Sequence, residues 1–257
     1  MKKIFKRLLP PSIVVMVIIL IWQLLSMNNL FPSYMLPSPY KVITAFIDEF
    51  DVLCYHGIIT VWEAILGIII GIIISLVMAI LMDMCAPIRH GLYPLLVTSQ
   101  TIPAIAIAPL LLLWFGYGIL PKIILIVITT FFPITVSLLE GFSSADKDSL
   151  KLIRLMGGNR FTEYIHIKFP EALGHFFSGL KISVTYSIIG AVISEWLGGT
   201  RGLGVYMTRV RKSFDYDKMF AVIFYVILIS LLLLLIVSVI KWLAMPWERK
   251  KNNYAKN

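Results

Sequence analysis

Long apolar runs without charge constrain this chain more than any other feature. The clearest is Met219–Ile240, which contains no Asp, Glu, Lys or Arg. A helix needs about 20 mostly apolar residues to cross a bilayer. Charged residues make up only 14% of the 257 positions, against about a quarter in a typical soluble domain. The sequence therefore predicts an all-α integral membrane protein with one transmembrane domain over residues 1–257.

Six stretches are long and apolar enough to be spans. We expect them at about 8–27, 61–82, 92–115, 122–140, 177–197 and 219–240. The third lies in an uncharged run that is too long for one span and contains Pro94, Pro103 and Pro109, which are expected to kink it, as Pro133 is in the fourth. The first follows a basic N-terminus, but no small-residue cleavage site comes after it, so we expect an uncleaved helix.

Two shorter patterns concern packing and the connection between the first two spans. Gly67 and Gly71 have the spacing that lets a second helix approach closely. Between the first and second spans, Leu36–Pro39 indicates a turn, and apolar residues recur at helical spacing from Val42 to Phe50. That pattern predicts a short amphipathic helix lying on the bilayer surface.

The distribution of Lys and Arg predicts the orientation. With both termini inside, the inner segments hold sixteen of the 23 basic residues and the outer segments hold seven. The positive-inside rule therefore favours cytoplasmic termini, a cytoplasmic loop over 141–176, and an exterior position for 28–56 and 198–218. Segment 198–218 is an exception to the rule, because it is basic although its predicted position is exterior. The net charge of +9 fits attraction to an anionic membrane surface, so we expect a lipid bilayer and no nucleic acid as partner.

The polar stretch Glu140–Lys181 is the most informative connection, because long loops in compact domains usually have a function. It contains a helical pattern from Asp148, a Gly157-Gly158 break, a short helix Asn159–Lys168, and a stop at Phe169-Pro170. Asn159 is a suitable N-cap. The apolar side chains of the short helix suit insertion into a groove of a partner protein; they are Phe161, Tyr164 and Ile165.

This loop resembles the EAA signature of ABC importer permeases, EAA-x3-G-x9-I-x-L-P. Gly157, Ile167 and Pro170 fall in register, whereas Lys151-Leu152-Ile153 replaces the EAA triplet and Phe169 replaces leucine. Further motifs resemble the nitrate, sulfonate and taurine branch of these permeases. They are Leu36-Pro37-Ser38-Pro39, Thr101-Ile102-Pro103, Ala108-Pro109-Leu110, Trp114-Phe115-Gly116-Tyr117-Gly118, Phe131-Phe132-Pro133 and Gly202-Leu203-Gly204.

The resemblance implies a type I importer permease fold in a bacterial inner membrane, with a cytoplasmic coupling helix. It implies a second permease copy, most simply in a homodimer, a pair of cytoplasmic ABC ATPases, and an extracytoplasmic substrate-binding protein or lipoprotein. No G-x-x-x-x-G-K-[ST] motif occurs, so the chain is expected to be no enzyme and to carry no cofactor, with ATP and Mg bound by the ATPase. The implied coupling residues are Gly157, Gly158, Asn159, Arg160, Phe161, Glu163, Tyr164, Ile167 and Pro170.

Within this branch, the WFGYG and FFP motifs are most similar to permeases for thiamine-pyrimidine precursors. Riboflavin permeases are nearby, and sulfonate, taurine or nitrate is the alternative cargo. The cargo is therefore expected to be a small polar solute.

Few polar groups inside the predicted spans are candidates for lining a pathway. Glu195 is either functional or a structural partner of Arg201. Ser99, Gln100 and Thr101 either line the pathway or make interhelical hydrogen bonds. We assign no function to Glu63. The four histidines and two cysteines fall in positions with no metal or catalytic spacing.

Three other classes of protein compete with the permease interpretation. A secondary transporter usually has internal repeats and several ionisable groups at the bilayer midplane, and neither pattern is found. A membrane-embedded enzyme needs clustered catalytic groups. A scaffold protein finds support only in the long loop.

Overall fold

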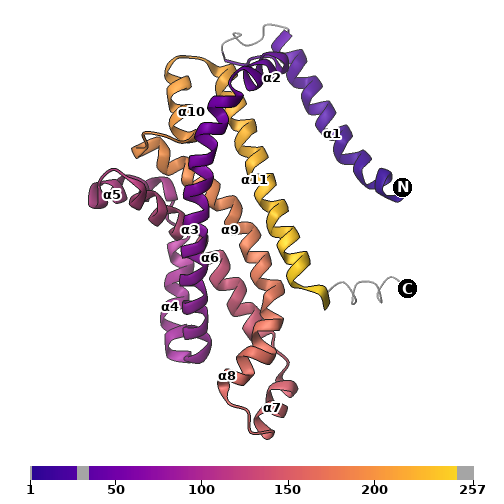
Figure 1. The fold of residues 1–257 in the computed structure, drawn as a ribbon, viewed down its shortest axis with the longest axis vertical. Coiled ribbons are helices and arrows are strands. Elements are labelled where there is room, and N and C mark those ends of the chain that lie inside the picture. Colours follow the sequence, from indigo (N-terminus) through magenta and orange to yellow (C-terminus); the bar gives the residue numbers. More distant parts are fainter. Residues whose placement is uncertain (1, 28–34, 248–257) are drawn as a thin grey trace.

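The computed structural model describes residues 2–27 and 35–247, with the backbone alone for residues 2–8 and Pro11. Every regular element in these ranges is a helix, and together they form an elongated bundle (Figure 1). The elements are α1 Lys2–Met27, α2 Pro39–Asp48, α3 Phe50–Met84, α4 Ala86–Ser99, α5 Ala104–Phe115, α6 Ile119–Ser143, α7 Lys147–Leu155, α8 Arg160–Glu163, the π-helix η1 Tyr164–Lys168, α9 Phe169–Gly198, α10 Leu203–Lys212 and α11 Tyr216–Ala244.

The centre of the bundle is built from α3, α6 and α9, whose contacts with one another are the most extensive in the molecule. Gly67 and Gly71 lie where α3 crosses α6. A Cβ on Gly67 would lie 2.3 Å from Ile126 Cγ2, and one on Gly71 would lie 2.7 Å from Thr130 Oγ1. The predicted close approach is therefore confirmed, and it joins two helices of the same chain.

Four helical stretches are long and apolar enough to cross a membrane, namely α3, α6, residues 160–198 and α11. They correspond to four of the six predicted spans. The pair α4 and α5 qualifies as one broken span, and the apolar part of α1 is the shorter segment Ser12–Met27. The basic residues at 249–256 that entered the orientation argument lie outside the described residues.

The third predicted span, 92–115, is corrected to two helices. The chain bends by 101° between α4 and α5, and Figure 1 shows α5 lying across the long axis of the bundle. The bend falls at Pro103, which lacks an N–H and pushes the residue before it out of the helical region. Pro94 and Pro109 lie inside α4 and α5, which continue through them.

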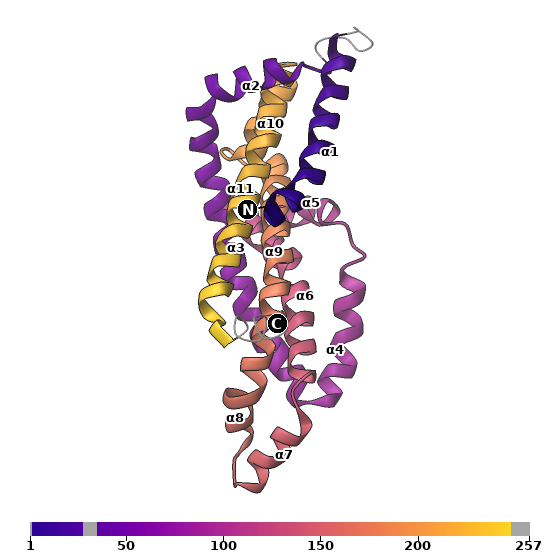
Figure 2. The same ribbon diagram turned by 90° about the vertical axis from the view of Figure 1, so that its right-hand side faces the viewer.

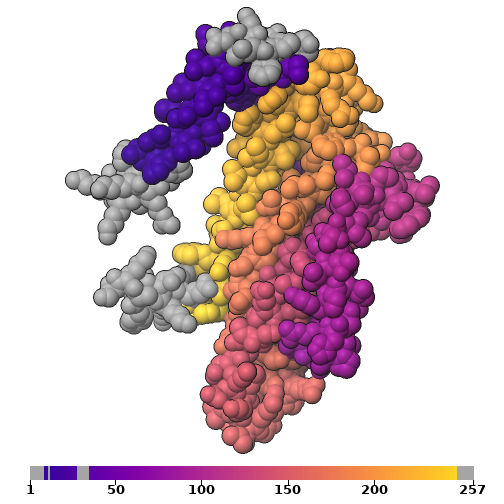
Figure 3. Space-filling model, turned by 180° about the vertical axis from the view of Figure 1, so that it is seen from behind, coloured from indigo at the N-terminus to yellow at the C-terminus, as the bar shows by residue number. Residues whose placement is uncertain are grey.

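The short helix predicted after the first span is confirmed as α2, and its place on the bilayer surface stays a prediction. Ser38 caps it by accepting a hydrogen bond from the Lys41 N–H. Val42 and Ala45 are buried, whereas Ile43 and Ile47 of the predicted apolar pattern are exposed. Helix α1 stands away from the other helices in Figure 3. It is held near its C-terminal end by Trp22, whose indole N–H donates to the Pro37 carbonyl oxygen at 3.0 Å.

Candidate functional site

The segment between α6 and α9, residues 144–168, projects from one end of the bundle (Figure 2); we call it the α6–α9 loop. Its first helix, α7, begins at Asp146, whose carboxylate accepts hydrogen bonds from the side chain and the N–H of Ser149. These bonds hold the pKa of Asp146 below its usual value. The Asp146 N–H donates in turn to the Glu171 carboxylate at 3.2 Å, so the start of α7 is tied to the first turn of α9.

The turn between α7 and α8 requires both of its glycines, for different reasons. Gly157 has φ of +82° and nothing lies within 4 Å of where a Cβ would be, so the requirement is one of backbone conformation. At Gly158 a Cβ would lie 2.3 Å from Ile153 Cγ2 and 2.9 Å from the Ile153 carbonyl oxygen, so the requirement is steric. The predicted Gly157-Gly158 break is confirmed.

An ion pair closes this turn. Arg154 of α7 donates from Nε to one oxygen of Glu163 at 2.6 Å and from Nη2 to the other at 3.2 Å. The Glu163 side chain is buried while the Arg154 side chain is largely exposed, and the pairing raises the pKa of Arg154. This two-pronged geometry fixes the angle between α7 and α8. Asn159 begins α8 as predicted, accepting from the Thr162 N–H at 2.9 Å.

The predicted stop at Phe169-Pro170 is wrong, because the chain remains helical from Arg160 to Gly198. The first part of this stretch widens into the π-helix η1, where the Phe169 N–H bonds to the Tyr164 carbonyl oxygen five residues earlier. Pro170 then occupies the first turn of α9. In an α-helix a proline ring clashes with the carbonyl four residues back, and the wider π-turn relieves that clash.

The π-helix is held against the bundle by Asp83 at the end of α3. The Asp83 carboxylate accepts hydrogen bonds from the Tyr164 hydroxyl and from the Lys168 ammonium group. The Lys168 ammonium also lies 4.7 Å from the centre of the Tyr164 ring. Phe142 of α6 packs edge-on against the same ring, with centroids 5.6 Å apart. Tyr164 therefore faces inward, which corrects its predicted place beside Phe161 and Ile165 on the outward face.

Several large apolar side chains are exposed on the outward surface of the α6–α9 loop, although the loop as a whole is polar. Phe161 is 72% exposed and Leu155 is 86% exposed. Exposed apolar side chains gathered in this way usually mark a surface that binds another protein. The full set is Leu152, Leu155, Met156, Phe161 and Ile165. Arg160 is also exposed, whereas Ile167 and Pro170 are half-buried.

The family model for "Binding-protein-dependent transport system inner membrane component" matches residues 67–244, which include the whole α6–α9 loop. The chain belongs to this family. A "Probable ABC transporter permease protein" of Haemophilus influenzae is 38% identical over 227 residues, 88% of this chain and 93% of that protein. The "Formylaminopyrimidine transport permease protein ThiX" of Halalkalibacterium halodurans is 33% identical over 252 residues, 98% of this chain and all of that protein.

A solved structure supports the same fold. A chain in the "Crystal structure of an amino acid ABC transporter with histidines" superposes with a TM-score of 0.57 at 18% identity, covering 79% of this chain and 94% of that one. The chain is therefore an ABC importer permease, a multi-pass inner-membrane transport subunit rather than an enzyme, with the type I permease fold. A separate ATPase hydrolyses ATP for such a permease.

At the opposite end of the permease, Glu195 of α9 is almost completely buried. Its carboxylate accepts from the Thr60 hydroxyl at 2.7 Å and from the Gly204 N–H at 2.6 Å. Its partners are therefore Thr60 of α3 and the first turn of α10, and not Arg201 as the structural interpretation of the sequence had it. The role of Glu195 in lining a pathway stays a prediction.

Other polar side chains of α3 surround Glu195. The Thr60 hydroxyl accepts from the Leu203 N–H at 2.9 Å, and His56 Nδ1 accepts from the Gly202 N–H at 3.0 Å. Glu63 pairs with Lys122 of α6 at 2.6 Å, and both side chains are more than nine-tenths buried. His56 was expected in a connection, and the structure places it inside α3. His56, Thr60 and Glu195 thus satisfy the N–H groups of Gly202, Leu203 and Gly204, which would otherwise be buried without partners.

Ser99, Gln100 and Thr101 lie at the break between α4 and α5 and are exposed in this single chain. The Ser99 hydroxyl donates to the Leu96 carbonyl oxygen, and the Thr101 hydroxyl donates to that of Thr98. The hydroxyls are thus satisfied locally, and no hydrogen bond between these residues and Glu195 occurs in the described part of the chain. The place of Ser99, Gln100 and Thr101 on a pathway stays a prediction.

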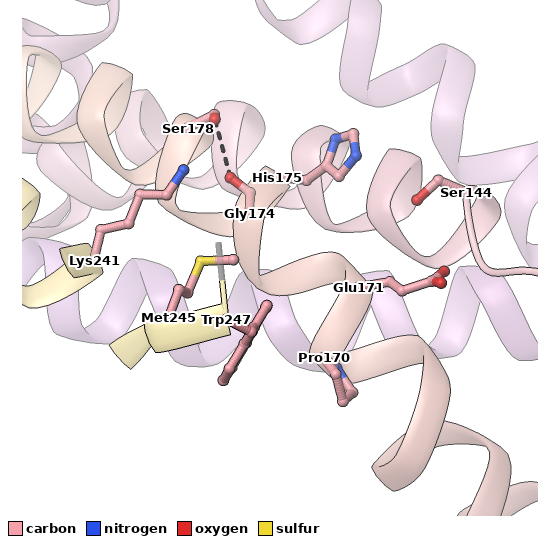
Figure 4. Close-up of a pocket in the computed structure, with 9 residues that line it drawn as sticks. All are labelled: Ser144, Pro170, Glu171, Gly174, His175, Ser178, Lys241, Met245 and Trp247. Carbon is pink, nitrogen blue, oxygen red and sulfur yellow. Dashed lines mark hydrogen bonds between the residues drawn. The ribbon is translucent and has the colours of Figure 1, made fainter. Parts of the chain in front are cut away.

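A cavity of about 830 Å³ lies beside the base of the α6–α9 loop, between the first turns of α9 and the end of α11 (Figure 4). Its polar lining includes Glu171, His175 and Lys241, and Trp247 closes one side. It is open to the surroundings and lies next to the tie between Asp146 and Glu171.

Sequence reasoning missed Asp83, Arg154 and Thr60, which hold these regions together; it named Glu163 but not the partner of Glu163. Asp83 directly follows an apolar span. That position indicates the end of a helix, but it does not reveal which residues Asp83 binds. Arg154 and Glu163 are nine residues apart, and only the Gly157-Gly158 turn makes them neighbours. Thr60 is an ordinary polar residue in an apolar helix, and nothing in the sequence distinguishes it.

Proposed function

We propose that the α6–α9 loop docks in the ATPase partner of this permease and transmits ATP-driven movement to the transmembrane helices. One observation carries the proposal, namely the apolar face from Leu152 to Ile165 on a loop that is braced from behind by Glu163, Tyr164 and Lys168. A loop that is already held in one conformation loses little conformational entropy when it binds, and its apolar side chains can be buried in a groove of the partner.

The docking proposal is tested by co-purification of the ATPase with the permease. Phe161→Glu places a charge on the apolar face, and Phe214→Glu is its matched control, since Phe214 is 69% exposed and lies in the connection between α10 and α11. Burial of one phenylalanine contributes about 1.5–3 kcal/mol, so we expect Phe161→Glu to weaken ATPase binding by roughly tenfold or more. Equal ATPase recovery with both variants would contradict docking through this face.

The proposed orientation places the α6–α9 loop and both termini in the cytoplasm, with α2 and α10 outside. It is supported by the Lys and Arg distribution and by the position of α2 and α10 at the end of the bundle opposite α7 and α8 (Figure 1). Single cysteines at Asp51 and Asn159, both exposed, test it in whole cells. An impermeant maleimide is expected to label position 51 only, and labelling of position 159 alone would reverse the orientation.

For the cargo, we propose a small planar heterocycle of the thiamine-pyrimidine precursor class. Support comes from the similarity to the formylaminopyrimidine permease over nearly the whole chain and from the WFGYG and FFP motifs. Sulfonates, taurine, nitrate and riboflavin are the alternatives. Mass spectrometry of the ligand that co-purifies with the partner binding protein decides among them. A formylaminopyrimidine is the expected ligand, and an alkanesulfonate or a flavin would overturn this assignment while leaving the docking proposal intact.

A further inference from the structure

Helix α3 is bonded at both of its ends to segments that lie at opposite ends of the permease. It has 35 residues, which at 1.5 Å per residue gives a rod about 50 Å long. One end contacts the α6–α9 loop through Asp83, and the other contacts the 199–204 turn through His56 and Thr60. Helix α9 is also bonded to both segments, through Glu171 to the Asp146 N–H and through Glu195 to the Gly204 N–H, but it is continuous with the loop whereas α3 is not.

At the loop end, Asp83 receives both the Tyr164 hydroxyl and the Lys168 ammonium group. The Asp83 side chain is 9% exposed and that of Lys168 is 16% exposed. A carboxylate and an ammonium group withdrawn from water stay together, because separating them leaves an uncompensated buried charge. The π-helix is thus fixed to α3 by a contact that is costly to break.

At the far end, α3 binds backbone N–H groups at the start of α10 and also the side chain of Glu195. His56 and Thr60 accept the N–H groups of Gly202 and Leu203, and Glu195 accepts that of Gly204. Three successive N–H donors of one turn are therefore held by α3 and α9. A shift of α3 along its axis moves two of these acceptors and so displaces the turn.

We propose that Asp83 is the positioning residue through which the α6–α9 loop moves α3 and, through α3, the 199–204 turn. Helix α9 follows the loop in any case, because its chain is continuous with the π-helix. Helix α3 has no such covalent link; it packs against α6 and α9, and its described polar bonds to the loop are those from Tyr164 and Lys168. The inference rests on the proposed docking of the loop, and it adds a defined link from that loop to the opposite end of the permease.

The test uses the assembled permease and ATPase in lipid nanodiscs. Thr200→Cys, at an exposed position in the turn, is introduced after Cys54 and Cys85 are replaced by serine, and its maleimide labelling rate is measured with and without ATP and vanadate. We expect ATP and vanadate to change the rate in the parent protein. In Asp83→Asn that change, measured in complexes that contain the same amount of bound ATPase as the parent, should shrink by roughly 2- to 30-fold.

Matched variants separate positioning from folding. Asp148→Asn is the control, because Asp148 also pairs with a lysine of the same loop but is 88% exposed; it should behave as the parent. Asp83→Glu should restore most of the response. If Asp83→Asn fails to accumulate, Tyr164→Phe and Lys168→Gln each remove one bond and should each reduce the response.

Three results would overturn the inference. They are a parent-like response in Asp83→Asn, a parent-like response in both single-bond variants, and the absence of any ATP-dependent change at position 200 in the parent. Failure of the docking proposal is recognised separately, since Phe161→Glu would then retain the ATPase.

Discussion

Replacing Gly157 by valine is expected to abolish ATP-driven uptake while the permease stays folded in the membrane. Gly157 has φ of +82° and open space around its Cβ position, so the whole penalty is conformational. A β-branched residue held in this region costs about 1–3 kcal/mol. The loop escapes that strain by returning residue 157 to negative φ, which swings α8 away from α7.

The bond that joins α8 directly to α7, and so opposes their separation, is the ion pair between Arg154 and Glu163. Because the Arg154 side chain is 65% exposed, its contribution is screened and is about 1 kcal/mol or less. The strain is therefore as large as the bond that resists it, or larger, and the apolar face is expected to tilt out of register with its groove. The transmembrane helices satisfy their own backbone hydrogen bonds and are little affected.

The assay measures membrane expression, ATPase co-purification and uptake in the same preparation. Gly91→Val is the matched control, because Gly91 lies in α4 with nothing within 4 Å of a Cβ and no positive φ. Gly157→Asn should be close to normal, since asparagine tolerates positive φ. Uptake above half of the parent level in Gly157→Val, at equal expression, would refute the reasoning.

Three further predictions concern the end of the permease opposite the loop. Lys122→Met leaves buried Glu63 without its counter-charge and should destabilise the permease by about 3–5 kcal/mol in thermal unfolding; adding Glu63→Gln should recover most of this, and no recovery would contradict it. Thr60→Val removes hydrogen bonds worth about 1–3 kcal/mol, so amide exchange over 199–206 should accelerate. Unchanged exchange would show that Thr60 does not stabilise this segment. The hydrogen bond from Lys218, in the first turn of α11, lowers the pKa of Glu49. The contact is therefore complete above the ordinary carboxyl pKa of about 4.3 and is lost as pH falls through the lowered pKa. Amide exchange near Glu49 should accordingly rise only below about pH 4.

Much of the fold follows from the sequence because lipid leaves a chain few choices. Apolar runs of span length must form helices to satisfy their backbone groups, which is why α3, α6 and α11 were predictable. The third span was not predictable in form. Its sequence contains three prolines, yet only Pro103 lies at the break, and the choice among them depends on packing that the sequence does not display.

The parts of the site that depend on local backbone conformation could be predicted from the sequence. The parts that depend on contacts between residues far apart in the sequence could not. Gly157-Gly158 and the N-cap at Asn159 are local signals, and the structure contains both. The π-helix is different, because a proline after a short helix normally ends it and only a widened turn avoids the stop. Asp83 lies 81 residues before Tyr164, so their pairing depends on how α3 and the loop come together.

Uptake by the purified permease in proteoliposomes tests the central claim most directly. Liposomes containing the permease and its ATPase receive formylaminopyrimidine-loaded binding protein outside and ATP inside, and uptake of the labelled solute is followed. The account predicts uptake only when the ATPase, the binding protein and ATP are all present, and loss of that uptake with Phe161→Glu. Uptake by the permease alone, driven by a proton or sodium gradient without the ATPase, would contradict it.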